Sequence, residues 1–104
     1  MPLPNPKDHR IPLEAAAAQT KGHRDSAGKD AVKGGLFLRK SIDELLAQPG
    51  VAGMRFYFGR SATNAPTLVL VGVDQAGNDL VNGVLDNDHF LCPPFCGTAN
   101  PLNS

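Results

Sequence analysis

Apolar residues in the first part of the chain recur at the spacing of a helix. Within residues 11–24, one face of the expected helix has the spacing i, i+3, i+4, i+7 and comprises Leu13, Ala16, Ala17 and Thr20. Pro12 suits a first helical position, and Gly22 is expected to end the helix. We therefore predict a first helix here, preceded by an extended and poorly ordered proline-rich arm over residues 1–10.

A second helix is predicted to start at Ser41. Ser41 and Glu44 have the S-x-x-E spacing of a capping box, in which two side chains satisfy free N–H groups at a helix start. The Pro-Gly pair at 49–50 is expected to end this helix. The polar segment at 24–35 is expected to be a linker, and the apolar run at 36–38 either a short strand or a lead-in to the helix.

After residue 50 the apolar pattern changes from the helical period to a period of two. Apolar residues alternate within 53–59, which predicts a strand with one buried face formed by Met54, Phe56 and Phe58. Residues 67–73 are apolar on both faces, as in a central strand that is covered on both sides.

The stretch DQAGND, at 74–79, is predicted to be a hairpin turn that leads to a third strand at 80–85. Its oxygen-bearing side chains, together with DNDH at 86–89, are of the type that binds calcium. The ligand order of an EF-hand is absent, so a plain turn is the favoured interpretation.

These elements together predict an α+β fold. Two N-terminal helices are expected to pack on a small antiparallel sheet of three to four strands, followed by an extended C-terminal tail that contains both cysteines. Residues 11–104 are expected to form a single domain, because a chain of 104 residues is long enough for one modest core.

Three stretches of the sequence resemble a family of small bacterial proteins without an established activity. They are IDELLAQPGVAGMRFYFG, TLVLVGVDQAGNDL and CPPFCG, and the resemblance extends over residues 11–102. Members are similar in a strand and turn of the type LVLVGVD-x-x-G-N-D and in a C-terminal C-P-P-x-C tail. The resemblance implies a shared fold and an important tail, and it transfers no mechanism.

The composition narrows the class of partner. The chain is 41% hydrophobic and 19% charged, and its formal net charge is zero, so nothing global favours a nucleic acid or an anionic membrane as partner. No apolar stretch is long enough to span a bilayer and no signal peptide is visible, which predicts a cytoplasmic protein.

The stretch HFLCPPFCG, at 89–97, is the main candidate for chemistry. His89, Cys92 and Cys96 could bind zinc, although a structural zinc site needs a fourth ligand. Alternatively, Cys92 and Cys96 could form a disulfide that closes a very short loop. A thioredoxin-like site is disfavoured, because the spacing is C-x-x-x-C and two prolines prevent a regular helix.

A fourth interpretation gives this tail no chemistry at all. The apolar residues Phe90, Leu91 and Phe95 would anchor an extended segment on the core, and the cysteines would be small buried hydrophobic residues.

A polar candidate lies on the first strand. Arg55 and Tyr57 are expected to point to one side, opposite Phe56, where they form either an interaction patch or a solvated strand face.

The sequence contains no phosphate-binding loop, nucleophile elbow or recognisable acid pair, so we predict no catalytic residue and no cofactor. The favoured function is therefore a non-enzymatic interaction protein whose partner is another protein. The alternative is a zinc-binding or redox-responsive protein that uses the cysteine pair. The sequence does not indicate an oligomeric state.

Overall fold

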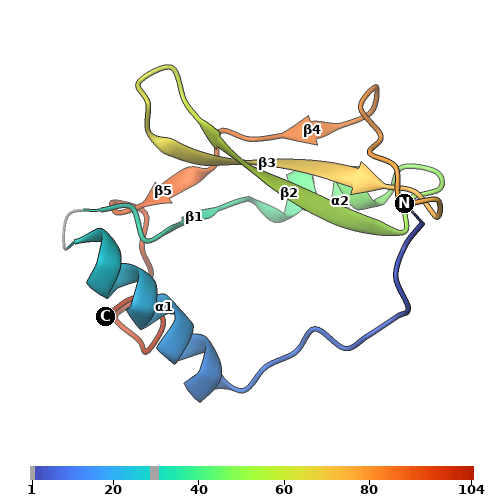
Figure 1. The fold of residues 1–104 in the computed structure, drawn as a ribbon. Coiled ribbons are helices and arrows are strands. Elements are labelled where there is room, and N and C mark those ends of the chain that lie inside the picture. The colour runs from blue at the N-terminus through green and yellow to red at the C-terminus, as the bar shows by residue number, and fades with distance from the viewer. Residues whose placement is uncertain (1, 29–30) are drawn as a thin grey trace. The chain divides into compact units, whose positions relative to one another are not determined.

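The computed structural model describes residues 2–28 and 31–104, which form two compact units (Figure 1). The sheet unit comprises residues 2–5 and Phe37–His89, and the disulfide unit comprises Pro6–Leu36 and Phe90–Ser104. Residues 11–104, which were predicted to form a single domain, are thus divided between the two units. The α+β class is as predicted, with antiparallel strands in each unit.

The sheet unit contains three antiparallel strands in the order β2-β3-β4. They are β2 (Gly53–Arg60), β3 (Pro66–Val73) and β4 (Leu85–Asp86). The predicted third strand at 80–85 is much shorter than expected, because the chain turns where the Gly83 N–H donates to the Leu80 carbonyl. Before that turn, only a single bridge between Val73 and Asp79 continues the pairing.

The turn after β3 is formed as predicted. The Asp74 N–H donates to the Asn78 carbonyl, and one Asp74 carboxylate oxygen accepts from the N–H groups of Ala76 and Asn78. Asp74 therefore serves the turn itself, as aspartate commonly does in tight turns.

The helix α2 (Arg39–Leu46) begins two residues before the predicted capping box. The capping box is wrong, because no described side chain caps this helix and the Ser41 N–H already donates to the Leu38 carbonyl within the first turn. Glu44 lies 3.9 Å from the Lys40 ammonium, one turn earlier, instead of reaching back to a helix start. The predicted end before Pro49 is confirmed.

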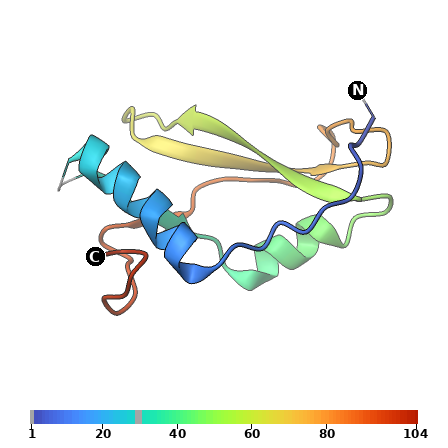
Figure 2. The ribbon, with the colours of Figure 1, turned by 60° about the horizontal axis from the view of Figure 1, so that its bottom comes forward.

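The core of the sheet unit lies where α2 meets β3 and β4. Leu45 of α2 is completely buried, and Leu70, Val71 and Val73 of β3 are at most 4% exposed. Figure 2 shows α2 running along one face of this sheet. Close approach is possible at Gly72, where an added Cβ would lie 3.1 Å from Cγ2 of Val51, in the segment that follows the helix.

The disulfide unit contains α1 (Leu13–Ala27) and the antiparallel pair β1 (Gly34–Leu36) and β5 (Phe90–Cys92). The helix continues past Gly22, so this predicted stop is wrong, and part of the predicted linker at 24–35 is helical. Residues 29–30 of that linker, like Met1 of the N-terminal arm, lie outside the described residues.

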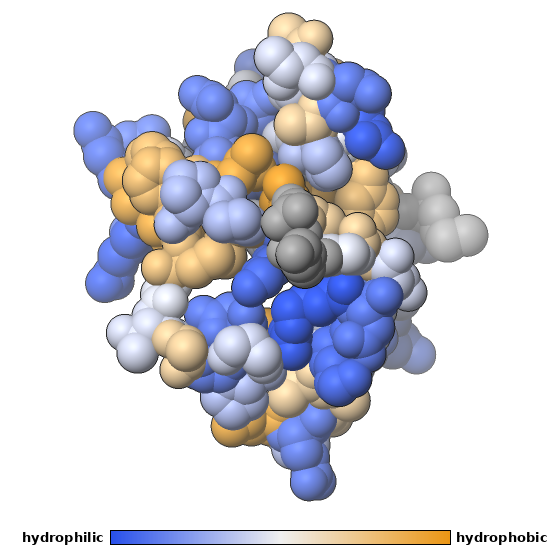
Figure 3. Space-filling model, turned by 90° about the vertical axis from the view of Figure 1, so that its left-hand side faces the viewer, coloured by the Kyte–Doolittle hydropathy of each residue, from blue (hydrophilic) through white to orange (hydrophobic). Residues whose placement is uncertain are grey.

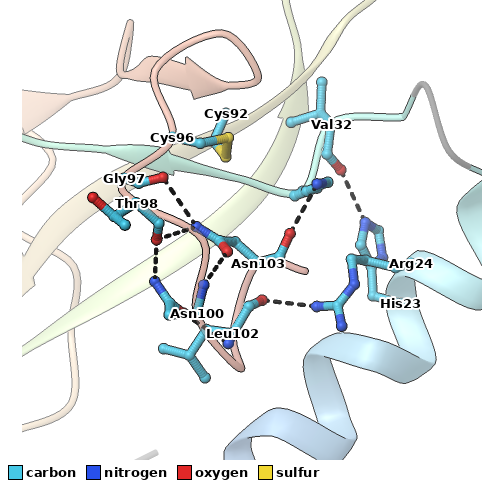
Figure 4. Close-up of a disulfide and its surroundings, with 11 residues drawn as sticks. His23, Arg24, Val32, Cys92, Cys96, Gly97, Thr98, Asn100, Leu102 and Asn103 are labelled. Carbon is cyan, nitrogen blue, oxygen red and sulfur yellow. Dashed lines mark hydrogen bonds between the residues drawn. A yellow bond between two sulfur atoms is a disulfide. The ribbon is translucent and has the colours of Figure 1, made fainter.

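Long polar side chains hold the C-terminal loop to the rest of the disulfide unit (Figure 4). The Arg24 guanidinium donates to the carbonyls of Leu102 and Ser104, and the Lys33 ammonium donates to the carbonyl of Asn103. In the part of the chain that is described, no helix has the length and apolar character needed to cross a membrane.

Candidate functional site: an open strand edge with an apolar face

The outer side of β2 forms an open edge of the three-stranded sheet. Leu80 N–H donates to the Gly72 carbonyl, so the backbone of Gly72 points away from β2. Backbone N–H and C=O groups alternate in direction along a strand. The backbone groups of Val71 and of its partner Arg55 therefore point toward each other. The backbone groups of Met54, Phe56 and Phe58 therefore point outward, and no other strand among the described residues pairs with them.

The side chains of these same three residues form an exposed apolar face on β2. Met54 is 44% exposed, Phe56 54% and Phe58 85%, and the two phenylalanine rings pack edge to face with centroids 5.6 Å apart. The predicted burial of this face is wrong, because among the described residues α2 packs chiefly on β3 and β4. Hydrophobic side chains also reach the surface among hydrophilic ones on the face that Figure 3 shows.

A shallow hollow lies beside the first half of this edge. It has a volume of about 250 Å³ and its lining includes Leu3, from the N-terminal arm, and Met54 and Phe56, from β2. Apolar side chains, together with Arg55, thus line a space next to backbone groups that pair with no other described strand.

The opposite face of β2 carries a polar cluster. Arg55 and Tyr57 lie on the same side, as predicted, and both bind the carboxylate of Asp79 at the end of the hairpin turn. The Arg55 guanidinium also donates to the Gly77 carbonyl at 3.3 Å. This cluster fastens the turn to β2, and Asp79 provides Arg55 with an anionic partner within the chain.

The hydrogen bonds of this cluster shift the ionisation of its members. The bond from Tyr57 lowers the pKa of Asp79, and the Arg55 guanidinium lowers it further, while partial burial opposes both. The bond to Asp79 raises the pKa of Tyr57, because the ionised phenol would lose that bond and face a carboxylate. The same carboxylate raises the pKa of Arg55.

We expect the Asp79→Asn variant to lose the acid sensitivity that this cluster gives the sheet unit. Because the folded pKa of Asp79 is depressed, its ionised form stabilises the fold above the ordinary value of 3.8, and that stabilisation is lost as the pH falls below it. Urea unfolding at a series of pH values, followed by the fluorescence of Tyr57, should show a smaller drop in stability below pH 4 for Asp79→Asn than for the wild type. Asp74→Asn, in the same turn, is the control, and equal pH profiles for wild type and Asp79→Asn would contradict this role.

The three residues of the predicted zinc site do not form a ligand set here. Cys92 and Cys96 are joined in a disulfide (Figure 4), so neither sulfur is a thiolate. The His89 ring packs on Phe37 of the sheet unit, with centroids 5.1 Å apart, and its Nδ1 is buried without a hydrogen-bond partner among the described residues. Across residues 2–28 and 31–104, no three residues of the types His, Cys, Asp and Glu are grouped so that they could hold a metal ion.

One of the four interpretations of the tail has Phe90, Leu91 and Phe95 anchor it on the core. Instead, Phe90 and Phe95 are 42% and 58% exposed and pack on each other, with ring centroids 5.1 Å apart. The tail is held mainly by backbone pairing, in which Gly34 lies opposite Cys92, and by the Lys33 N–H, which donates to the Cys92 carbonyl at 2.7 Å.

Comparisons with known proteins add no further information, since no family model, curated protein or solved structure matches the chain. The functional interpretation therefore depends on the geometry of the chain itself.

Proposed function

We propose that this chain is a non-enzymatic interaction protein that accepts an extended segment of another protein along the outer edge of β2. The observation that carries the proposal is the coincidence of two features on the same three residues. Met54, Phe56 and Phe58 present both outward backbone groups and exposed apolar side chains. A partner strand that pairs with this edge would bury both at once.

The edge lacks the features that usually prevent such pairing. Proteins protect exposed edge strands with proline, lysine or bulges, and β2 contains no proline or lysine. Of its two charged residues, Arg55 is neutralised by Asp79, and Arg60 is the last residue of the strand. The central part of β2 is therefore open to an apolar partner strand.

The expected affinity is modest. Each apolar side chain that becomes buried contributes about 1.5–3 kcal/mol. Association costs about 4–15 kcal/mol in lost translational and rotational freedom, which is comparable to what three such side chains and their backbone bonds contribute, so we expect weak binding. This strength is typical of a reversible interaction.

Selection from a display library of random extended peptides would test the proposal. We expect selected peptides to have apolar residues at alternate positions and to shift the amide resonances of Met54, Phe56 and Phe58. The Phe58→Lys variant should lose this binding, whereas Val81→Lys, at a 64% exposed position elsewhere in the sheet unit, should keep it. Selected peptides that bind both variants equally, or that shift no resonance of β2, would overturn the proposal.

The disulfide favours a second candidate function, which is a redox-responsive tail. Disulfides are rare in the cytoplasm, where the sequence predicts this protein to reside, so there the reduced form would be the resting state. Reduction by a dithiol breaks the Cys92–Cys96 bond, leaves one proton on each sulfur and converts the reductant into its own disulfide. Cys92 also pairs with Gly34, so the redox state acts directly on the β1–β5 pair.

Hydrogen exchange in both redox states would test this candidate. On reduction we expect faster exchange at the N–H of Lys33, which donates to Cys92, and at the N–H of Phe95, which donates to Leu91. A double variant, Cys92→Ser with Cys96→Ser, should not respond to the reductant. Identical exchange in the oxidised and reduced wild type would exclude a switch, and zinc retained by the reduced protein would instead favour the metal-binding alternative with His89.

A further inference from the structure

We propose that the partner on the β2 edge is a second copy of this chain, and that the two β2 strands pair antiparallel around a twofold axis at Phe56. This inference rests on the proposed function, because it uses the same edge. It assigns to that edge one occupant, a β2 strand of identical sequence.

The symmetric register follows from the direction of the backbone groups. With Phe56 opposite its own copy, Met54 lies opposite Phe58 of the second copy, and all of these residues direct their N–H and C=O groups outward. In an antiparallel pair such residues exchange two hydrogen bonds with the residue opposite. Their side chains lie on one face of the joined sheet, so the two apolar faces become continuous.

The charges of the two copies are compatible with this register. Arg55 falls opposite Tyr57 of the second copy, and a guanidinium beside an aromatic ring is favourable. Within each copy the Arg55 charge is balanced by Asp79, so the two Arg55 side chains do not repel each other strongly. Arg60 lies opposite Ala52, at the outer end of the pair, and the formal net charge of the chain is zero.

The hollow beside the edge gives this register a place for the most exposed side chain. Phe58 is 85% exposed, and in the symmetric pair it lies opposite Met54 of the other copy. Met54 lines the hollow together with Leu3 and Phe56. Each copy therefore offers an exposed ring and an apolar hollow at matching ends of the strand.

Sedimentation of the purified full chain over a range of concentrations would test the pairing. We expect a reversible dimer, with a dissociation constant raised at least about 100-fold by Phe58→Lys, because each dimer loses two buried rings. Val81→Lys should dimerise like the wild type. A wild type that stays monomeric at millimolar concentration would overturn the inference.

Hydrogen exchange would identify the surface that the two copies share. As the concentration rises, exchange at the N–H groups of Met54, Phe56 and Phe58 should slow. The N–H groups of Arg55 and Tyr57 should be equally protected at all concentrations, because they face β3. A dimer that leaves the outward N–H groups unprotected would exclude edge pairing. A monomer that still binds library peptides at β2 would reject self-pairing and leave the proposed function intact, whereas a monomer that binds none would reject both.

Discussion

Replacing Leu45 with alanine is expected to lower the free energy of unfolding of the sheet unit by about 2–5 kcal/mol. Leu45 is 0% exposed and is the largest side chain that is fully buried in the described part of the chain. Its removal costs the transfer free energy of the lost methyl groups and leaves a cavity where α2 meets the sheet. With a small core, few other contacts are available to offset this loss.

The adjacent leucine provides a matched control. Leu46 belongs to the same helix but is 46% exposed, so Leu46→Ala removes the same atoms with the same change in helix propensity. We expect it to cost less than about 1 kcal/mol. Urea unfolding, followed by the fluorescence of Tyr57, the single tyrosine of a chain without tryptophan, measures both variants. Equal losses for the two variants would show that α2 does not pack as described.

Alternation along the strands predicted most of the sheet. The stretches at 53–59 and 67–73 form β2 and β3 with almost the expected bounds. They were predictable because their apolar patterns are typical of strands and not of helices. The hairpin turn was equally clear from its Asp, Asn and Gly residues. These features depend only on neighbours in the sequence.

The burial of β2 could not be predicted in the same way. Alternation showed that Met54, Phe56 and Phe58 share a face, but whether another element covers that face depends on where α2 packs. One signal was present in the sequence, because a helix as short as α2 covers only part of a sheet. The sequence therefore predicted which residues share the apolar face, but only the structure shows that this face is exposed to solvent.

The helix ends show the same limit. The Ser41 and Glu44 spacing of a capping box also fits two residues within a first turn, and Glu44 instead lies near Lys40. Gly22 did not end α1, since a single glycine costs a helix only about 1 kcal/mol. The state of the cysteines could not be derived from their spacing, which is compatible with a disulfide, a free pair or zinc ligation.

A single glutamine connects the end of α2 with the segment before β4, and its replacement should have the second large effect. The Gln48 side-chain oxygen accepts from the Val84 N–H at 2.8 Å, and its nitrogen donates to the Leu45 carbonyl at 2.7 Å. Gln48→Ala leaves both partly buried groups without their partner. We expect a loss of about 1–3 kcal/mol in the free energy of unfolding.

Gly83→Ala should produce a similar loss by a different route. A Cβ at Gly83 would overlap the side-chain oxygen of Gln48, so the glutamine must move and give up its bond to Val84. Gly53→Ala is the control, because no atom of the described residues outside its chain neighbours lies within 4 Å of a Cβ added there. The double variant combines Gln48→Ala with Gly83→Ala, so the new methyl group occupies space that the glutamine side chain has vacated. The double variant should therefore lose about 0.5–3 kcal/mol less in the free energy of unfolding than the sum of the two single losses. Additive losses would mean that Gly83 is constrained by its contact with the Leu80 carbonyl and not by the side chain of Gln48.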